Sequence, residues 1–383
     1  MSAASLRLFL CGDVMIGRGV DQILPAPCPP KLYEEYLSSA EDYVRLAEEA
    51  SGPIPRKADF AYVWGDALEA FQAKAPDARI VNLETSVTLN EAAEAKSVNY
   101  RVSPTNAACL SAAGIDCCAL ANNHVLDWGP RGLIDTLDTL AHFGIETAGA
   151  GRDLDAAQRP AILDIPRKGR LLILSFASPD GGAPRDWAAT GAAPGVNLLA
   201  DLSPRSAARA CDLANSFRGP GDILIVSIHW GPNWGYGVPD DQRRFAHELI
   251  EKADAAVVHG HSSHHAKGME VHRNRLILYG CGDFLNDYEG ISGYERFRGD
   301  LSLMYFADID AASGDLVALA LVPLHMRRFR LERASGADAD WLARRLDRES
   351  APYGVRIRRR DDGTLYAHWR DGDACDAPRA API

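Results

Sequence analysis

The sequence predicts an α/β fold, and two observations carry that prediction. Short apolar stretches recur along the 383-residue chain, rich in branched side chains and bounded by Gly, Asp, Asn or Pro. Such stretches are typical of buried strands. Amphipathic stretches of helical length stand between them. This alternation predicts layers of helix and sheet in which most strands are covered on both faces.

The order of the elements follows from these stretches. Strands are expected at residues 6–11, 78–83, 117–120, 171–176, 223–228, 255–259 and 276–280. Helices are expected at residues 33–50, 64–75, 130–143, 203–218 and 240–253. The last part changes character: two stretches alternate like half-exposed antiparallel strands and one more is helical, at residues 300–308, 314–323 and 338–349.

The simplest division of the chain is one main domain with a C-terminal extension. We expect the main domain over residues 1–331 and a helix and strand extension over residues 332–370. Residues 371–383 are polar, with Pro and Ala, and are expected to form a disordered tail.

Charge and hydrophobicity exclude several classes of partner. The net charge of −11 argues against a nucleic-acid or anionic-membrane partner. A small anionic substrate stays compatible, because a local metal cluster can outweigh the overall field. The apolar stretch near the N-terminus is shorter than a signal-peptide core, and no window reaches the roughly 20 apolar residues that span a bilayer. We therefore expect a cytoplasmic protein and leave its oligomeric state open.

The cysteines favour buried free thiols over a disulfide framework. No two of them form a CxxC pair, and several lie inside apolar runs. That pattern is typical of a reducing compartment. The eight are Cys11, Cys28, Cys109, Cys117, Cys118, Cys211, Cys281 and Cys375.

Polar residues that follow expected strands are the first functional candidates, because ligands collect at the carboxyl ends of strands in α/β sheets. Asp13 follows the first strand and is flanked by Gly12 and Gly17. It is either a metal ligand or a cap of the next segment. Glu84 follows the second strand and is either a surface residue or a carboxylate able to bridge two metal ions.

The next strand end carries an amide, an imidazole and a carboxylate close together. Asn123 and His124 are adjacent, and Asp127 lies three residues further on. This set can supply a metal ligand, an acid/base group and the partner that orients it. The alternative is an Asn-rich turn with a packed histidine.

Histidines dominate the later strand ends. His229 follows the strand at 223–228 and, taken alone, suits a structural role. Four histidines then occur within seven residues, which packing alone explains poorly, and neutral imidazoles at this density favour a transition metal. They are His259, His261, His264 and His265. The combined nitrogen and oxygen ligand set, without cysteine, favours Mn, Fe or Zn over Ca or Mg.

These motifs, in this order and spacing, resemble the CapA family, named for poly-γ-glutamate capsule synthesis, within the calcineurin-like metallophosphatase superfold. The resemblance runs from about residue 6 to residue 331. It rests on Gly12-Asp13-Val14-Met15, Asn82-Leu83-Glu84, Tyr100-Arg101-Val102-Ser103-Pro104, Asn122-Asn123-His124, His229-Trp230-Gly231, Gly260-His261-Ser262-Ser263-His264-His265 and Tyr279-Gly280-Cys281-Gly282-Asp283-Phe284.

The resemblance implies a four-layer αββα sandwich with a C-terminal β extension and two divalent metal ions between the sheets. One ion would be held by Asp13, Glu84 and His264. The other would be held by Glu84, Asn123, His229 and His261, so that Glu84 bridges the two. His124 would be the acid/base group, oriented by Asp127.

Two departures from the metallophosphatase pattern stand out. Met15 occupies the place of the usual histidine in the first motif. The last motif is lengthened, so the choice of ligands among His261, His264 and His265 stays open. Both departures weaken the expectation of an ordinary phosphatase.

Three functions are compatible with these features. The first is a metal-dependent peptide epimerase, because the family includes soluble peptide-tailoring enzymes, among them a lasso-peptide epimerase. Inversion needs acid/base groups on both faces of an α-carbon. His124 or Asp13 would serve one face and His325 the other, unless His325 is only a packed strand residue.

The nearby Arg327, Arg328 and Arg330 would pair with a substrate carboxylate or with surface acids. The second function is a CapA-like enzyme of poly-γ-glutamate or envelope metabolism that hydrolyses an amide or a phosphoester. The third is a non-catalytic binding protein, which the nearly complete ligand set disfavours. A peptide substrate is the expected partner.

Overall fold

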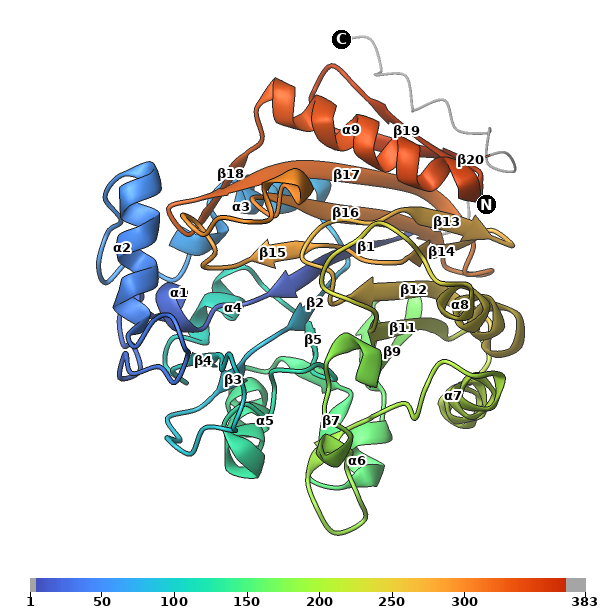
Figure 1. The fold of residues 1–383 in the computed structure, drawn as a ribbon. Coiled ribbons are helices and arrows are strands. Elements are labelled where there is room, and N and C mark those ends of the chain that lie inside the picture. Colours follow the sequence, from blue (N-terminus) through green and yellow to red (C-terminus); the bar gives the residue numbers. More distant parts are fainter. Residues whose placement is uncertain (1–4, 370–383) are drawn as a thin grey trace.

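The computed structural model describes residues 5–369, in which two β-sheets stack face to face (Figure 1). The larger sheet has the strand order β19-β20-β17-β16-β1-β2-β5-β6, with β15 paired to β1 and β18 paired to β17. Its strands are β1 (Ser5–Val14), β2 (Ala78–Leu83), β5 (Cys117–Ala119), β6 (Glu146–Ala148), β15 (Asp283–Leu285), β16 (Leu301–Asp310), β17 (Leu316–Arg327), β18 (Arg330–Arg333), β19 (Val355–Arg359) and β20 (Leu365–Trp369).

The second sheet has the order β13-β14-β12-β11-β9-β8. Its four central strands run parallel, and the antiparallel strands β13 and β8 form its edges. The strands are β8 (Ala161–Ile165), β9 (Gly169–Ala177), β11 (Ile223–His229), β12 (Ala255–His261), β13 (Met269–His272) and β14 (Arg275–Leu278). Two short pairs stand apart: β3 (Ser86–Val87) with β4 (Arg101–Val102), and β7 (Ala150–Gly151) with β10 (Gly195–Val196).

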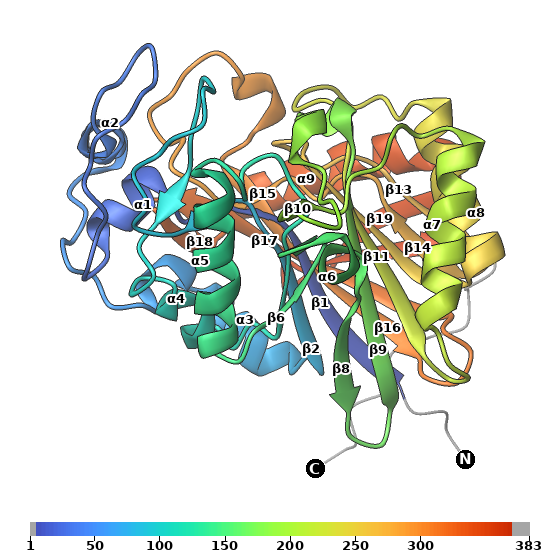
Figure 2. The same ribbon diagram turned by 90° about the horizontal axis from the view of Figure 1, so that it is seen from below.

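Helices cover the outer faces of both sheets. Figure 2 shows α5 on one side of the stacked sheets and α7 and α8 on the other. The helices are α1 (Arg18–Ile23), α2 (Ala40–Ser51), α3 (Ala67–Lys74), α4 (Ala108–Ala112), α5 (Gly129–His142), α6 (Leu154–Gln158), α7 (Pro204–Phe217), α8 (Asp240–Ala253) and α9 (Gly336–Ser350).

Side chains along a strand point alternately to the two faces of its sheet, and this alternation explains how the layers pack. In β1, Leu8 and Leu10 point into the core between the sheets, whereas Phe9 points outward under the helices of the larger sheet. In β11, Ile225 faces the same inter-sheet core and Val226 faces α7 and α8. Both faces of these strands are buried, which is why they read as continuous apolar runs. The predicted four-layer αββα sandwich is confirmed.

The C-terminal elements enlarge the larger sheet. Strands β19 and β20 continue it beyond β17, and α9 lies beside them, with Leu342 and Leu346 buried in the inter-sheet core (Figure 1). The predicted β extension is therefore present. The division at residue 331 stays a prediction, and the expected tail at 371–383 lies outside the described residues.

The helix predicted at residues 33–50 was wrong at its start. The backbone turns back between Lys31 and Ser39, which form a β-bridge, and the helix begins only at Ala40. Ser39 adopts an extended conformation, and its side chain accepts a hydrogen bond from the Glu41 N–H, so it caps the helix.

The expectations about the cysteines and about membrane-spanning segments can also be compared with the structure. Seven cysteines lie within the described residues, and all of them are buried free thiols, whereas Cys375 lies outside. Among residues 5–369, no helix is both long and apolar enough to cross a bilayer.

Candidate metal centre

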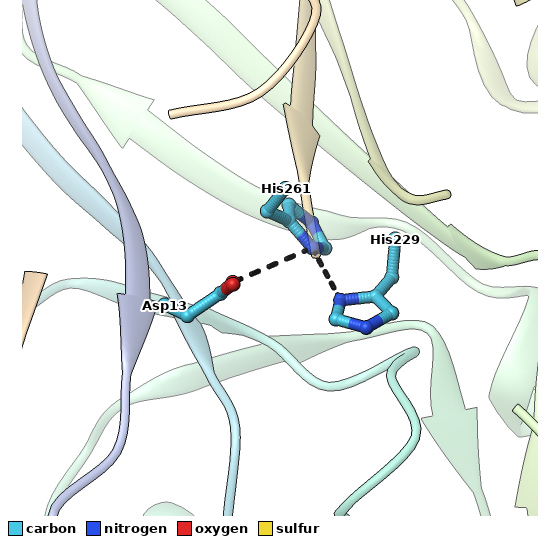
Figure 3. Close-up of side chains that lie close together, drawn as sticks. All are labelled: Asp13, His229 and His261. Atoms are coloured by element: carbon cyan, nitrogen blue, oxygen red, sulfur yellow. Dashed lines mark hydrogen bonds and ion pairs between the residues drawn. The ribbon is translucent and has the colours of Figure 1, made fainter. Parts of the chain in front are cut away.

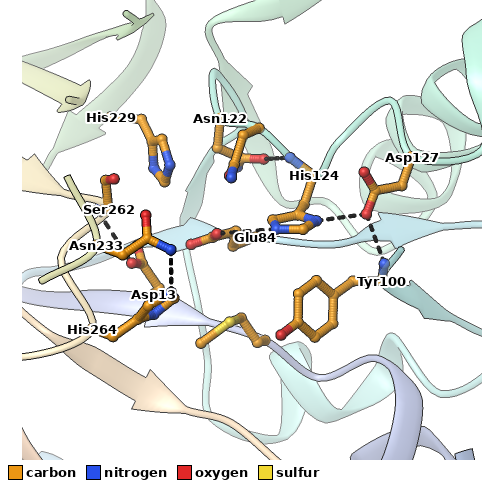
Figure 4. Close-up of polar contacts among 12 residues, drawn as sticks. Asp13, Glu84, Tyr100, Asn122, His124, Asp127, His229, Asn233, Ser262 and His264 are labelled. Atoms are coloured by element: carbon orange, nitrogen blue, oxygen red, sulfur yellow. Dashed lines mark hydrogen bonds and ion pairs between the residues drawn. The ribbon is translucent and has the colours of Figure 1, made fainter. Parts of the chain in front are cut away.

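The predicted ligands meet where strands of both sheets end. Asp13 lies near the end of β1 and Glu84 directly follows β2, both in the larger sheet. His229 and His261 are the last residues of β11 and β12 in the second sheet. All four are at least 98% buried. The sandwich therefore brings residues from both sheets to one buried centre, as Figure 4 shows for several of them.

Asp13 stands in the middle of this centre. Its Oδ1 accepts a hydrogen bond of 2.7 Å from the Asn82 side chain, and its Oδ2 accepts one of 3.2 Å from the Ser262 N–H. Asn82 comes from β2 and Ser262 follows β12, so the carboxylate is held by both sheets. Burial and the neighbouring Asp283 carboxylate raise the pKa of Asp13 to about 7. A buried carboxylate in this setting calls for a cation.

Asp283 is a member of the centre that the sequence reasoning missed. It pairs with Asp13 in the parallel register of β1 and β15, so the two side chains lie on the same face. Asp13, His264 and Asp283 each offer a ligand atom within 4.8 Å of the others. The available signal was the repeated Gly-Asp pair, Gly12-Asp13 and Gly282-Asp283, each following an apolar strand.

Two histidines form the opposite wall. The Nδ1 atoms of His229 and His261 lie 2.9 Å apart, and His261 Nδ1 lies 3.9 Å from Asp13 Oδ1 (Figure 3). Burial lowers the pKa of both rings well below the usual value, which keeps them in the neutral form that binds metals. Asp13, His229 and His261 form a second group with ligand atoms within 4.8 Å. Asp13 therefore belongs to both groups.

Unpartnered buried atoms on the predicted ligands fit the presence of a metal ion at this centre. Glu84 Oε2, Asn123 Oδ1 and His229 Nε2 are buried, and none has a hydrogen-bond partner among the described residues. An orphaned buried polar atom is costly, so three of them on predicted ligands indicate a missing partner. Burial and the charge of Asp13 also raise the pKa of Glu84 well above its usual value. Positive charge supplied between these residues would satisfy all of these groups.

The later histidines separate into different roles. His264 Nδ1 lies 2.8 Å from Asp283 Oδ1. Burial lowers the pKa of the His264 ring, but the charge and the hydrogen bond of Asp283 outweigh this effect and raise it. His265 points away into an aromatic cluster, with its ring stacked on Phe297 at 4.6 Å and its Nε2 accepting from the Gly235 N–H. His259 Nε2 lies 2.6 Å from the Cys11 carbonyl oxygen. Of the residues left open, His261 and His264 thus lie with the ligands.

His124 and Asp127 lie in contact, as the prediction of an acid/base group and its orienting partner requires. His124 Nδ1 lies 2.6 Å from Asp127 Oδ2, and its Nε2 lies 3.7 Å from Glu84 Oε1 (Figure 4). Asp127 also accepts hydrogen bonds from the Tyr100 N–H at 2.6 Å and from the Lys96 ammonium at 2.6 Å. Burial lowers the pKa of His124 to about 4. A neutral ring that donates from Nδ1 to Asp127 presents a proton-accepting Nε2 toward the centre.

The structure does not bring His325 to this centre. His325 lies on β17, two strands from β1 in the sheet order, and its Nε2 lies 3.4 Å from Asp300. Arg328 and Arg330 pair with Glu332 and Asp66, which are surface acids, and Arg327 is exposed. Arg328 and Arg330 therefore pair with acids of the chain, which is the alternative to binding a substrate carboxylate. An acid/base role for His325 stays a prediction without geometric support.

Comparison with known proteins fits this geometry. The family model described as bacterial capsule synthesis protein PGA_cap matches residues 7–288, most of the chain. The chain belongs to this family. The motifs that carried the resemblance to CapA fall inside the matched region, so the relationship to CapA is confirmed.

Three relatives show how similar this PGA_cap family member is to named proteins. A Mycobacterium tuberculosis protein named "Probable polyglutamine synthesis accessory protein" is 47% identical over 364 residues, covering 94% of this chain and 95% of its own length. The "PGA biosynthesis protein CapA" of Bacillus subtilis is 25% identical over 296 residues, covering 77% and 66%. The "Capsule biosynthesis protein CapA" of Bacillus anthracis is 23% identical over 270 residues, covering 70% and 61%.

Met15 shows how this PGA_cap member fills the place of the usual metallophosphatase histidine. Its side chain is buried, and its sulfur accepts a hydrogen bond from the Tyr288 hydroxyl at 3.7 Å. Tyr288 in turn lies 2.6 Å from the Tyr100 hydroxyl, and the Tyr100 ring contacts His124 edge-on at 4.5 Å. Met15 is therefore linked through two tyrosines to His124.

Proposed function

We propose that this chain is a metal-dependent hydrolase that cleaves an amide or phosphoester bond in the metabolism of a polyglutamate-type or capsule polymer. The observation that carries the proposal is the convergence of three unpartnered buried ligand atoms with the His124–Asp127 pair. Ligands without an acid/base group would favour a structural metal site. Their combination favours catalysis.

We assign the ligands to two divalent ions, with Mn, Fe or Zn preferred over Ca or Mg. The donor set contains carboxylate, amide and imidazole atoms and no thiolate, which suits these metals. Asp13, Asp283 and His264 would hold one ion, and Asp13, His229 and His261 the other. Glu84 Oε2 and Asn123 Oδ1 would be further ligand atoms, since both are buried and unpartnered among the described residues. Bound ions supply Lewis acidity and a nucleophilic water.

The chain's own residues handle the proton. His124, neutral and fixed through Nδ1 by Asp127, takes up a proton at Nε2, which faces the centre. The Lys96 ammonium lies 2.6 Å from Asp127 Oδ1 and so pairs with the carboxylate that orients the ring. Asn82 and the Ser262 N–H keep the Asp13 carboxylate oriented.

The names of the relatives guide the choice of substrate. One is named for polyglutamine synthesis and another for PGA biosynthesis. We therefore propose a glutamate- or glutamine-based polymer, or a phosphorylated intermediate of its synthesis, as the substrate in the cytoplasm. A peptide epimerase is the other candidate, but its second acid/base group, His325, pairs with Asp300 instead.

The deciding experiment is a reconstitution assay in D2O. Metal-stripped protein is loaded with Mn, Fe or Zn and incubated with poly-γ-glutamate, with polyglutamine peptides and with a panel of phosphoesters. Hydrolysis that requires both metal and His124 supports the proposal. Deuterium at an α-carbon without cleavage overturns it in favour of epimerisation, and neither reaction with any substrate rejects the substrate class.

A further inference from the structure

A buried hydrogen-bond network ends on the Nε2 atom of the predicted ligand His261. His259 Nε2 lies 2.6 Å from the carbonyl oxygen of Cys11, and His259 Nδ1 lies 3.1 Å from Ser227 Oγ. Ser227 Oγ in turn lies 2.9 Å from His261 Nε2. All four residues are fully buried, and they come from β1, β11 and β12, so the network joins the two sheets. We call Cys11, His259, Ser227 and His261 the His261 network.

The start of the His261 network determines where each of its protons lies. A carbonyl oxygen only accepts, so His259 Nε2 donates to Cys11. His259 is buried, and no carboxylate among the described residues pairs with it, so its ring is neutral and carries only that proton. Its Nδ1 therefore accepts, and the Ser227 hydroxyl donates to it. Because a hydroxyl has one proton, Ser227 Oγ accepts at its other contact, from His261 Nε2.

This order of protons leaves His261 Nδ1 as the unprotonated atom of the ring. Nδ1 is the atom that lies 3.9 Å from Asp13 Oδ1 and 2.9 Å from His229 Nδ1 (Figure 3). His229 Nδ1 is then the donor in the contact between the two rings, and His229 Nε2 is unprotonated. His229 Nε2 is also the atom without a partner among the described residues, which agrees with this assignment. Each ring therefore offers a metal ion one unprotonated nitrogen.

We propose that Ser227 and His259 are positioning residues, which fix His261 in the tautomer that binds a metal ion through Nδ1. The Ser227 hydroxyl can point to either neighbouring ring, and only donation to His259 gives this tautomer. If Ser227 donated to His261 Nε2, the ring proton would lie on Nδ1 and block the ligand atom. Outer partners that set the tautomer of a ligating histidine are a recurrent part of metal sites. This role rests on the metal centre of the proposed function and is independent of the reaction that the centre drives.

Two variants and one matched control test these roles. Ser227→Ala removes the hydroxyl that accepts from His261, and His259→Leu removes the acceptor that orients this hydroxyl. The control is Ser175→Ala. Ser175 pairs with Ser227 in the register of β9 and β11, is buried, and has a hydroxyl without a partner among the described residues. The control thus removes a buried hydroxyl from the same face of the sheet but leaves the His261 network intact.

The first measurement is the affinity for Zn²⁺. Metal-stripped full-length protein is titrated in competition with a chelator of known Kd, and circular dichroism checks that each variant is folded. Ser227→Ala and His259→Leu should each bind one Zn²⁺ roughly 10- to 100-fold more weakly than the wild type, whereas Ser175→Ala should match the wild type. Wild-type affinity in both network variants, or an equal loss in the control, overturns the proposal.

The second measurement is the tautomer of His261 in the metal-free protein, read from the ¹⁵N chemical shifts of the ring. The His261 signals are assigned by their absence in His261→Gln. The wild type and Ser175→Ala should carry the proton on Nε2, and His259→Leu should shift it to Nδ1. A wild-type ring protonated on Nδ1 overturns the proposal. The expected tautomer without any bound Zn²⁺ would instead overturn the proposed metal centre, so the two failures are distinguishable.

Discussion

His124 is the residue to which we assign the transfer of a proton in the proposed hydrolysis. We predict that His124→Asn lowers the rate of hydrolysis by roughly 100- to 10,000-fold, the usual contribution of a positioned acid/base group. The reason is that an amide cannot accept the proton that His124 Nε2 takes up opposite Glu84. The measurement is kcat with the substrate identified by the reconstitution assay, together with the metal content of the variant.

The control for this prediction is the metal count. The two metal groups contain Asp13, His229, His261, His264 and Asp283, so His124→Asn should retain wild-type metal content. Asp127→Asn should also lower kcat, because Asp127 orients the ring through Nδ1. Wild-type kcat in His124→Asn would contradict the assigned role.

Lys267 is a buried lysine whose charge costs the fold stability. It is 3% exposed, makes no ion pair with the described residues, and burial lowers its pKa to about 8. At pH 7 the fold therefore carries a charged lysine at a cost of about 3 kcal/mol, because its pKa lies about 2.5 below the ordinary 10.5 and each pKa unit corresponds to about 1.36 kcal/mol. We predict that Lys267→Met raises the free energy of unfolding by about that amount, measured by urea denaturation.

The pH dependence of this gain tests its cause. Because the folded pKa lies below the unfolded value of 10.5, the wild type gains stability as the pH rises from about 8 to about 10.5. The advantage of Lys267→Met should shrink over that window. Lys252→Met, at an exposed lysine paired with Glu248, should give no such gain. A gain in Lys267→Met that is constant with pH would argue for better packing instead.

The pairing of strands β1 and β15 places the carboxylates of Asp13 and Asp283 side by side. A Cβ on Gly12 would lie 1.6 Å from the Gly282 carbonyl oxygen, so only glycine allows this approach. We predict that Gly12→Ala costs about 3 kcal/mol or more, because backbone must move. It should also lose metal, because the register of Asp13 with Asp283 depends on this contact. Urea denaturation and metal analysis measure the two effects.

The matched control is an exposed glycine without neighbours. A Cβ on Gly191 would meet nothing within 4 Å, so Gly191→Ala should keep wild-type stability and metal content. If Gly12→Ala behaved like Gly191→Ala, the close contact of β1 and β15 would not be what aligns the carboxylates.

At the scale of elements, the sequence predicted those helices and strands that are long enough to show a periodic pattern of apolar residues. The helix expected at 240–253 matches α8 at both ends, and the strand at 78–83 matches β2. Strand β15 has three residues and β3 has two, too few for a period to show. The helix expected at 33–50 begins too early, because apolar residues continue at helical spacing through the preceding loop. The helix starts only after its N-cap residue, Ser39.

At the scale of the whole molecule, the sequence indicated which strand ends carry chemistry but not which of them meet. Asp13 and His261 are far apart in the chain, and stacking of the two sheets brings them to 3.9 Å. Asp283 joins through a three-residue strand whose pairing partner no local pattern reveals. His325 was linked to the site by its residue type, while the sheet order places it two strands from β1. Which residues of the two sheets lie close together is decided by how the sheets stack, and motifs in the sequence do not contain that information.

Removal of metal should destabilise the whole sandwich, because the centre joins its two sheets. At a free metal concentration about 100 times Kd, each site contributes on the order of 3 kcal/mol. We predict that a chelator lowers the Tm and that the loss grows as the pH rises from about 4 to 7. In the metal-free protein the pKa of Asp13 is about 7, above its ordinary 3.8.

The sign follows from proton binding. Between these two pKa values the folded metal-free state holds more protons than the unfolded state, so its stability falls as the pH rises. The metal-loaded protein behaves in the opposite way, because its ligands bind metal only when deprotonated. Differential scanning calorimetry with and without chelator should therefore give curves that diverge toward neutral pH. In Asp13→Asn the metal-free slope should flatten, since the residue no longer titrates, whereas parallel curves in the wild type would show that these carboxylates do not hold metal.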